Sequence, residues 1–237
     1  MPQFGQQLDI DSAYRLQTRA LKILLAGKRP DGFKAGLTST AAQEKFSFRQ
    51  PVAGVLLAGS QLAADEQGTY SIRASAYPKL MMEIEIGFQL DAAISVAVAD
   101  VKTLKTLVRT IYPVIELPDL GFEDMPSLAG TDIIANNVAA RKYIVGQNPQ
   151  APPANLNAMQ IDLYRDGQLI LHGKGSDALG DQWQALLWLV NRSLANGWIL
   201  QPGQILITGA LGKMLPAARG QYSAHYEGLG QINWRVE

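Results

Sequence analysis

MMEIEIGFQL, residues 81–90, alternates between apolar and polar side chains over most of its length. A period of two is typical of a β-strand, whose successive side chains point to opposite faces. A strand here places Ile84, Ile86 and Phe88 on one face, which we interpret as a core face. Glu83 and Glu85 share the other face, roughly 7 Å apart along the strand. The stretch therefore predicts a sheet with a pair of carboxylates on one side.

The negative charges of these two carboxylates repel each other and must be screened or compensated. Like charges that close raise each other's pKa unless a positive group lies near them. A third carboxylate, Glu116, lies in the apolar run 114–117, where an acid must face water, a cation or a metal. Three carboxylates in a chain without cysteine favour Mg²⁺ or Mn²⁺ over Zn²⁺. The alternative interpretation is a sheet face on which water solvates all three.

The composition is that of a globular protein with one large domain or two small ones. Of its 237 residues, 47% are hydrophobic and 18% charged, which excludes a disordered chain. Lys and Arg together number 21, as do Asp and Glu, so the formal net charge is 0. This balance gives no indication of binding to nucleic acid or to an anionic membrane. With 0 Cys and 2 His, catalysis must use carboxylates, Lys, hydroxyls or an oxygen-bound metal. We expect a cytoplasmic protein with no nucleic-acid or membrane partner.

Helical periodicity marks three segments of the chain, the first of them at its beginning. Apolar residues at helical spacing predict a helix over residues 9–27 and another over 100–111. A third helix is expected over 181–197, where Asp at the start and Gly at the end are good caps. The rest is rich in strands. We therefore expect a small helical N-terminal part, residues 1–50, and a mixed β-sheet catalytic body, residues 51–237.

Two hairpins are indicated in the second half of the chain. The pair Asp166-Gly167 separates two apolar, strand-like runs and is a strong two-residue turn signal. A second hairpin is expected around residues 228–230. Both predictions place strands late in the sequence.

The segment 34–39 combines a cation with hydroxyls. Lys34 precedes a glycine turn that leads into Thr38, Ser39 and a helix start. Free N–H groups and hydroxyls in such a place suit a substrate carboxylate, with Lys34 as the proton carrier. The alternative is a solvated loop lysine. The pair Asn136-Asn137 is interpreted either as a ligand contact or as a cap or turn.

Five stretches, in consistent order over most of the chain, form a pattern of modest motifs. They are KAGLTS (34–39), EIEI (83–86), VIEL (114–117), IANNVA (134–139) and the run 175–209. Together they resemble the 2-keto-4-pentenoate hydratase and 4-oxalocrotonate decarboxylase branch of the fumarylacetoacetate hydrolase superfamily. The resemblance implies an α+β fold with a mixed β-barrel-like sheet body, flanking helices and a small helical N-terminal part. It also implies a homo-oligomer, because family members commonly assemble in this way.

The resemblance also implies a metal site. In the family, a Glu-x-Glu pair and a later Glu hold a divalent cation, usually Mg²⁺, which maps the ligands to Glu83, Glu85 and Glu116. Lys34 is then the acid–base or charge-stabilising group. The candidates for substrate binding are Thr38, Ser39, Asn137 and Thr208.

The substrate that the resemblance implies is a 2-keto or 2-hydroxydienoic acid that chelates the metal and reacts through an enolate. We therefore expect a Mg²⁺-dependent hydratase of a 2-hydroxy-2,4-dienoate in meta-cleavage breakdown of aromatic compounds. One alternative is a 4-oxalocrotonate-type 2-keto acid decarboxylase. Another is a binding or partner subunit with reduced catalysis, because the stretch 51–54 lacks the acid that hydratases of this branch often carry there. Neither His172 nor His225 lies near the N-terminal motifs, which argues against the hydrolases of the superfamily.

Overall fold

Two β-sheets and the helices around them make up the fold, which the computed structural model describes for residues 1–4, 8–46 and 48–237. The α-helices are α1 (Ile10–Leu25), α2 (Thr40–Lys45), α3 (Val101–Lys105), α4 (Gly130–Ala135) and α5 (Gln182–Ala195). The strands are β1 (Gly32–Gly36), β2 (Val52–Leu56), β3 (Tyr70–Ile72), β4 (Met81–Leu90), β5 (Val108–Leu117), β6 (Lys142–Val145), β7 (Gln160–Arg165), β8 (Gln168–Lys174), β9 (Ile205–Ile207), β10 (Leu215–Pro216), β11 (Gly220–Tyr226) and β12 (Gly230–Val236). In the part of the chain described, no helix has the length and apolar character needed to span a membrane.

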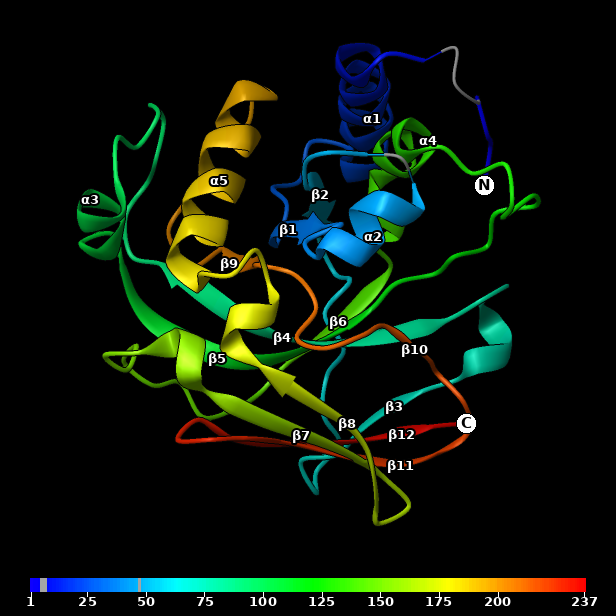
Figure 1. Cartoon of the computed structure of the whole chain (residues 1–237), viewed down its shortest axis with the longest axis vertical. Coiled ribbons are helices and arrows are strands. Elements are labelled where there is room, and N and C mark those ends of the chain that lie inside the picture. The colour runs from blue at the N-terminus through cyan, green and yellow to red at the C-terminus, as the bar shows by residue number, and fades with distance from the viewer. Residues whose placement is uncertain (5–7, 47) are drawn as a thin grey trace.

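The strands form one seven-stranded and one five-stranded sheet. The first has the order β2-β1-β9-β4-β5-β6, with β10 paired to β4, and it is mixed because β1 and β9 run parallel. The second has the order β3-β12-β11-β7-β8. Figure 1 shows the second sheet below the first, with α1, α2, α4 and α5 above. This arrangement confirms the α+β fold with a mixed sheet body.

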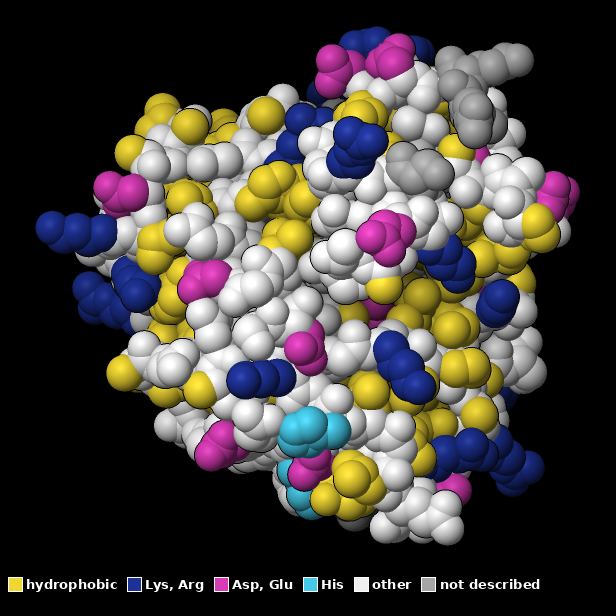
Figure 2. Space-filling model, in the orientation of Figure 1, with side chains coloured by type: hydrophobic (Ala, Val, Ile, Leu, Met, Phe, Trp, Pro, Cys, Tyr) yellow, Lys and Arg dark blue, Asp and Glu magenta, His cyan; other side chains and the backbone are white. Residues whose placement is uncertain are grey.

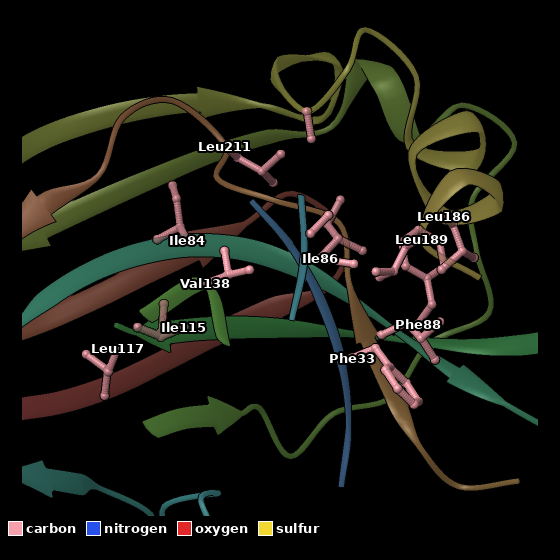
Figure 3. Close-up of a cluster of buried hydrophobic side chains, with 14 of the residues drawn as sticks. Phe33, Ile84, Ile86, Phe88, Ile115, Leu117, Val138, Leu186, Leu189 and Leu211 are labelled. Atoms are coloured by element: carbon pink, nitrogen blue, oxygen red, sulfur yellow. The ribbon is translucent and has the colours of Figure 1, made fainter. Parts of the chain in front are cut away.

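Strand β4 lies at the centre of the first sheet, between β9 and β5. Its predicted core residues, Ile84, Ile86 and Phe88, are all buried. Figure 3 shows them among side chains from β5 and α5. On the opposite face, Val114 pairs with Glu85 in the β4–β5 register and belongs to a second, smaller apolar cluster. All residues of β4 except Glu83 and Gln89, which are half-buried, are buried, so both faces of the strand lie largely within the protein.

The local turn and cap signals act as the sequence predicts. Asp166 and Gly167 join β7 to β8 with φ values of 50° and 79°, as a type I′ hairpin turn requires. Asp181 caps α5, because its carboxylate accepts a hydrogen bond from the backbone N–H of Gln184 at 2.9 Å. The helix over residues 9–27 is also confirmed as α1.

Two local predictions differ from the structure. The helix expected over residues 100–111 is only α3, and from Val108 the chain is the strand β5. The residues from Val108 on are rich in β-branched and aromatic side chains, and pairing with β4 outweighs their helical spacing. The expected glycine turn after Lys34 is instead the end of β1, which pairs with both β2 and β9. Residues 32–36 of the N-terminal part thus belong to the first sheet.

Candidate active site

The pairing of β4 with β5 brings three glutamates together. Glu83 lies directly opposite Glu116 in the antiparallel register, and Glu85 follows two residues later on the same face of β4. One carboxylate oxygen from each lies within 4.8 Å of the others. Glu85 and Glu116 are 0% exposed. The alternative of a solvated sheet face therefore does not hold for this group, which we call the glutamate trio.

Lys34 supplies the neighbouring positive charge. It comes from the middle of β1, which is separated from β4 only by β9. Its side chain is buried, and Nζ lies 2.7 Å from Oε1 of Glu116. Nζ also donates a hydrogen bond to the backbone oxygen of Val138 at 3.1 Å. The predicted alternative of a solvated loop lysine is wrong, because Lys34 is a buried partner of the trio.

Burial dominates the electrostatics of the site. Desolvation raises the pKa of Glu83 to about 7, although the positive charge of Lys34 opposes this shift. Desolvation also raises the pKa of Glu85, and the negative charges of Glu116 and Glu83 add to it. Desolvation would lower the pKa of Lys34, but the charges of the trio outweigh it and raise that pKa. One lysine thus does not compensate three carboxylates, and in the absence of a cation the site favours the neutral, protonated form of Glu85.

The donor atoms fit a hard divalent cation. Within the described ranges, Oε1 of Glu85 and Oε2 of Glu116 are buried and have no hydrogen-bond partner. Buried carboxylate oxygens without partners carry a large desolvation cost, which a cation between them offsets. All the ligand atoms are oxygens, the type that Mg²⁺, Mn²⁺ and Ca²⁺ prefer. The trio can therefore hold such an ion.

A cavity of about 480 Å³ opens beside the trio. Lys34 and Glu83 line it, together with the hydroxyl residues Thr38 and Ser39. Most of its remaining wall is apolar and comprises Leu37, Phe46, Leu120, Met125, Ile133, Val138 and Met214, among others. Figure 2 shows this as a hollow with yellow side chains between α2 and β10. The site combines a charged floor with hydrocarbon walls.

The predicted substrate-binding residues fall into two groups. Thr38 and Ser39 line the cavity, and the Ser39 hydroxyl also caps α2 by accepting from the N–H of Ala42. The Asn137 side chain instead accepts from the Val55 N–H at 2.7 Å and donates to the Val55 carbonyl at 2.9 Å. Thr208 is fully buried and donates its hydroxyl to Gln182 at 2.6 Å. Their roles as substrate contacts remain predictions.

Sequence reasoning missed the backbone groups of the site. Gly209 donates its N–H to Oε2 of Glu85 at 2.6 Å, and the Val138 carbonyl holds Lys34. Val138 has a φ of 52°, within a left-handed turn over residues 137–139. Side-chain chemistry gives no signal for either contact. A glycine shortly after a predicted strand, as at Gly209, is the one available hint.

The sequence of this chain is similar to those of known enzymes. No protein-family model matches the chain. It is 32% identical to 2-keto-4-pentenoate hydratase of Paraburkholderia phymatum over 211 residues, which cover 87% of this chain and 78% of that protein. It is 30% identical to the TodF product hydratase of Pseudomonas putida over 233 residues, or 95% of this chain and 84% of that one.

Solved structures show the same fold. The 4-oxalocrotonate decarboxylase of Pseudomonas putida G7, complexed with magnesium and adipate, matches 98% of this chain and 87% of its own with a TM-score of 0.86 at 21% identity. Fumarylpyruvate hydrolase of Pseudomonas aeruginosa, in complex with Mn²⁺ and pyruvate, matches 88% of this chain and 89% of its own. The TM-score is 0.61 and the sequence identity is 15%. The chain therefore shares its fold with 4-oxalocrotonate decarboxylase and with a fumarylacetoacetate hydrolase family protein, and it belongs to the 2-keto-4-pentenoate hydratase family of enzymes.

Proposed function

We propose that the protein is a Mg²⁺-dependent hydratase that adds water to a 2-hydroxy-2,4-dienoate formed by ring cleavage of an aromatic compound. The observation that carries this proposal is the glutamate trio, buried with Lys34 beside an apolar cavity. Two relatives, a 2-keto-4-pentenoate hydratase and a 2-hydroxyhexa-2,4-dienoate hydratase, support the reaction class. The expected homo-oligomer is a prediction alongside it.

The trio would hold the metal, with Glu83, Glu85 and Glu116 as its ligands. When bound, Mg²⁺ supplies charge stabilisation for negative charge that develops on the substrate's C2 oxygen. The pairing of Lys34 with Glu116 keeps the lysine protonated at the cavity floor. From there, the Nζ of Lys34 can donate a proton to a substrate in the cavity.

The rest of the cavity would orient the substrate. Thr38 and Ser39 line the same cavity as Lys34, and a hydroxyl can donate a hydrogen bond to a carboxylate. The apolar walls pack against the hydrocarbon part of a dienoate and exclude bulk water from its conjugated system. These two features hold a polar head near the trio and a carbon chain along the walls.

A decarboxylase of a 2-keto dioate is a second candidate. Lys45 and Lys213 lie at the wall of the same cavity, and both are exposed. A second carboxylate at the far end of a substrate would find a cationic partner in either side chain. The metal ligands alone do not separate the two reactions.

The test uses the purified chain with Mg²⁺ and a series of 2-hydroxydienoates. We expect ultraviolet absorbance of the dienoate to fall on addition of enzyme and to stay constant when EDTA is present, since hydration removes the conjugation. Release of CO₂ from 4-oxalocrotonate without dienoate hydration would favour the second candidate. No turnover of either substrate would leave the binding or partner subunit as the better hypothesis.

Metal removal is expected to destabilise the protein. Mg²⁺ at about 100 times its dissociation constant adds about 2.7 kcal/mol to the free energy of unfolding, because only the folded chain assembles the trio. For a chain of this size, each kcal/mol raises Tm by about 2–4 °C. Thermal melts with Mg²⁺ and with EDTA measure the shift. Identical melting curves would contradict a metal site at the trio.

A further inference from the structure

The two oxygens of the Glu85 carboxylate have different environments. Oε2 accepts a hydrogen bond from the N–H of Gly209 at 2.6 Å. Oε1 is buried, and within the described ranges it has no hydrogen-bond partner. The bond from Gly209 therefore engages Oε2 and leaves Oε1 as the oxygen available to a cation. The direction of the Gly209 N–H thus controls how Glu85 faces the other two glutamates.

Gly209 occupies a position where the sheet ends. The ladder between β4 and β9 runs as far as the pair Gly87 and Ile207, and Gly209 lies two residues beyond it. Its φ of 112° lies in the region that favours glycine, and a Cβ here would lie 2.2 Å from Oγ1 of Thr38. The ladder does not hold this N–H in place, so its direction depends on the residue that precedes it.

Thr208, that preceding residue, is anchored by a buried chain of hydrogen bonds. Its hydroxyl donates to Oε1 of Gln182 at 2.6 Å. The Gln182 amide nitrogen in turn donates to the carbonyl of Gly175 at 2.7 Å. Both Thr208 and Gln182 are 0% exposed. Because the amide has its nitrogen committed to Gly175, only its oxygen faces Thr208, and the whole chain of bonds has a single direction.

This chain of bonds connects the first turn of α5 to a metal ligand. Gln182 is the first residue of α5, and the helix packs on the face of β4 opposite the trio, with Trp183 against Phe88 at 5.3 Å between ring centroids. A helix anchored there is a rigid support. Groups that orient a metal ligand affect affinity although they never touch the ion.

We propose that Gln182 and Thr208 are positioning residues that aim the Gly209 N–H at Glu85 and so set the affinity of the trio for a divalent cation. This inference rests on the proposed function in one respect, namely that the trio binds Mg²⁺. It assigns Thr208 a place behind the site, with its hydroxyl directed at Gln182.

The experiment measures the Mg²⁺ dissociation constant by titration calorimetry for the full chain and its variants. Thr208→Val removes the hydroxyl at nearly constant volume, and Gln182→Met removes the amide. We expect each variant to weaken Mg²⁺ binding by about 10–100-fold, the range typical of lost outer-shell partners. Thr208→Ser keeps the hydroxyl and is expected to restore wild-type affinity.

Gln204→Met is the matched control. Gln204 is 1% exposed and also makes two hydrogen bonds, to the Pro30 carbonyl and from the Gln201 N–H, but it precedes β9 at the end remote from Gly209. We expect this variant to lose thermal stability and to keep its Mg²⁺ affinity. Wild-type affinity in Thr208→Val and Gln182→Met, or an equal loss in Gln204→Met, would overturn the positioning role. A wild-type chain that binds no Mg²⁺ would instead refute the proposed metal site and this inference with it.

Discussion

Glu85→Gln is expected to weaken Mg²⁺ binding by at least about 100-fold and to abolish turnover at ordinary Mg²⁺ concentrations. Glu85 is fully buried, and its Oε1 is one of the carboxylate oxygens without a partner beside Glu116. The amide keeps the size of the side chain and can still accept from Gly209, but it removes one negative charge from the ligand set. Titration calorimetry measures the affinity, and dienoate absorbance measures the turnover.

The control for this variant is a second buried acid. Asp119 is 2% exposed and accepts a hydrogen bond from the Lys79 N–H at 2.9 Å, outside the trio. Asp119→Asn therefore makes the same chemical change at a comparable depth. We expect it to keep the Mg²⁺ affinity of the wild type. Undiminished Mg²⁺ binding by Glu85→Gln would remove Glu85 from the ligand set.

Lys34→Met is expected to lower turnover by about 10²–10⁴-fold, the usual contribution of a positioned acid or base. Unlike Glu85→Gln, this variant is not expected to weaken Mg²⁺ binding. Lys34 contributes the positive charge 2.7 Å from Glu116, so its removal leaves three carboxylates uncompensated and makes the trio a stronger cation site. We therefore expect Mg²⁺ affinity to be retained or increased. The two measurements are kcat and the Mg²⁺ dissociation constant.

Two further variants define the role of Lys34. Lys102→Met removes an exposed lysine of α3 and is expected to leave both quantities unchanged. Lys34→Arg keeps the positive charge but has no proton to give at neutral pH. Restored turnover in Lys34→Arg would indicate that the lysine acts by its charge alone. Full turnover in Lys34→Met would exclude both roles, and circular dichroism verifies that each variant is folded.

Local signals in the sequence account for much of the fold. The alternation over residues 81–90 predicts β4 and its core face, because a strand exposes alternate side chains to one environment. Asp166-Gly167 predicts the β7–β8 hairpin because few other pairs adopt positive φ at both positions. The expected helix over residues 100–111 is wrong from Val108 on, because these residues pair with β4 and form β5. This pairing depends on residues outside the segment itself.

The sequence also indicates which residues form the candidate site. Glu83 and Glu85 are related by the period of the strand, and Glu116 is conspicuous as an acid in an apolar run. Apart from the family resemblance, the sequence shows Lys34 only as a lysine near hydroxyls and a glycine. Its burial, and its pairing with Glu116, depend on β9 lying between β1 and β4. No local pattern predicts such a strand order, because β9 lies some 170 residues after β1 in the chain.

The residues alone are enough to tell which side chains share a face of β4, where the hairpin turns, and that three acids require a cation or water. These properties depend on neighbours within a few residues. The burial of Glu85 and Glu116, which excludes a sheet face solvated by water, follows only from the packing of the whole chain. The tertiary structure also decided that Thr208 bonds to Gln182 and that Gly209 donates to Glu85. Such contacts join residues on separate elements, and the burial that makes them strong exists only once the sheets and helices have packed together.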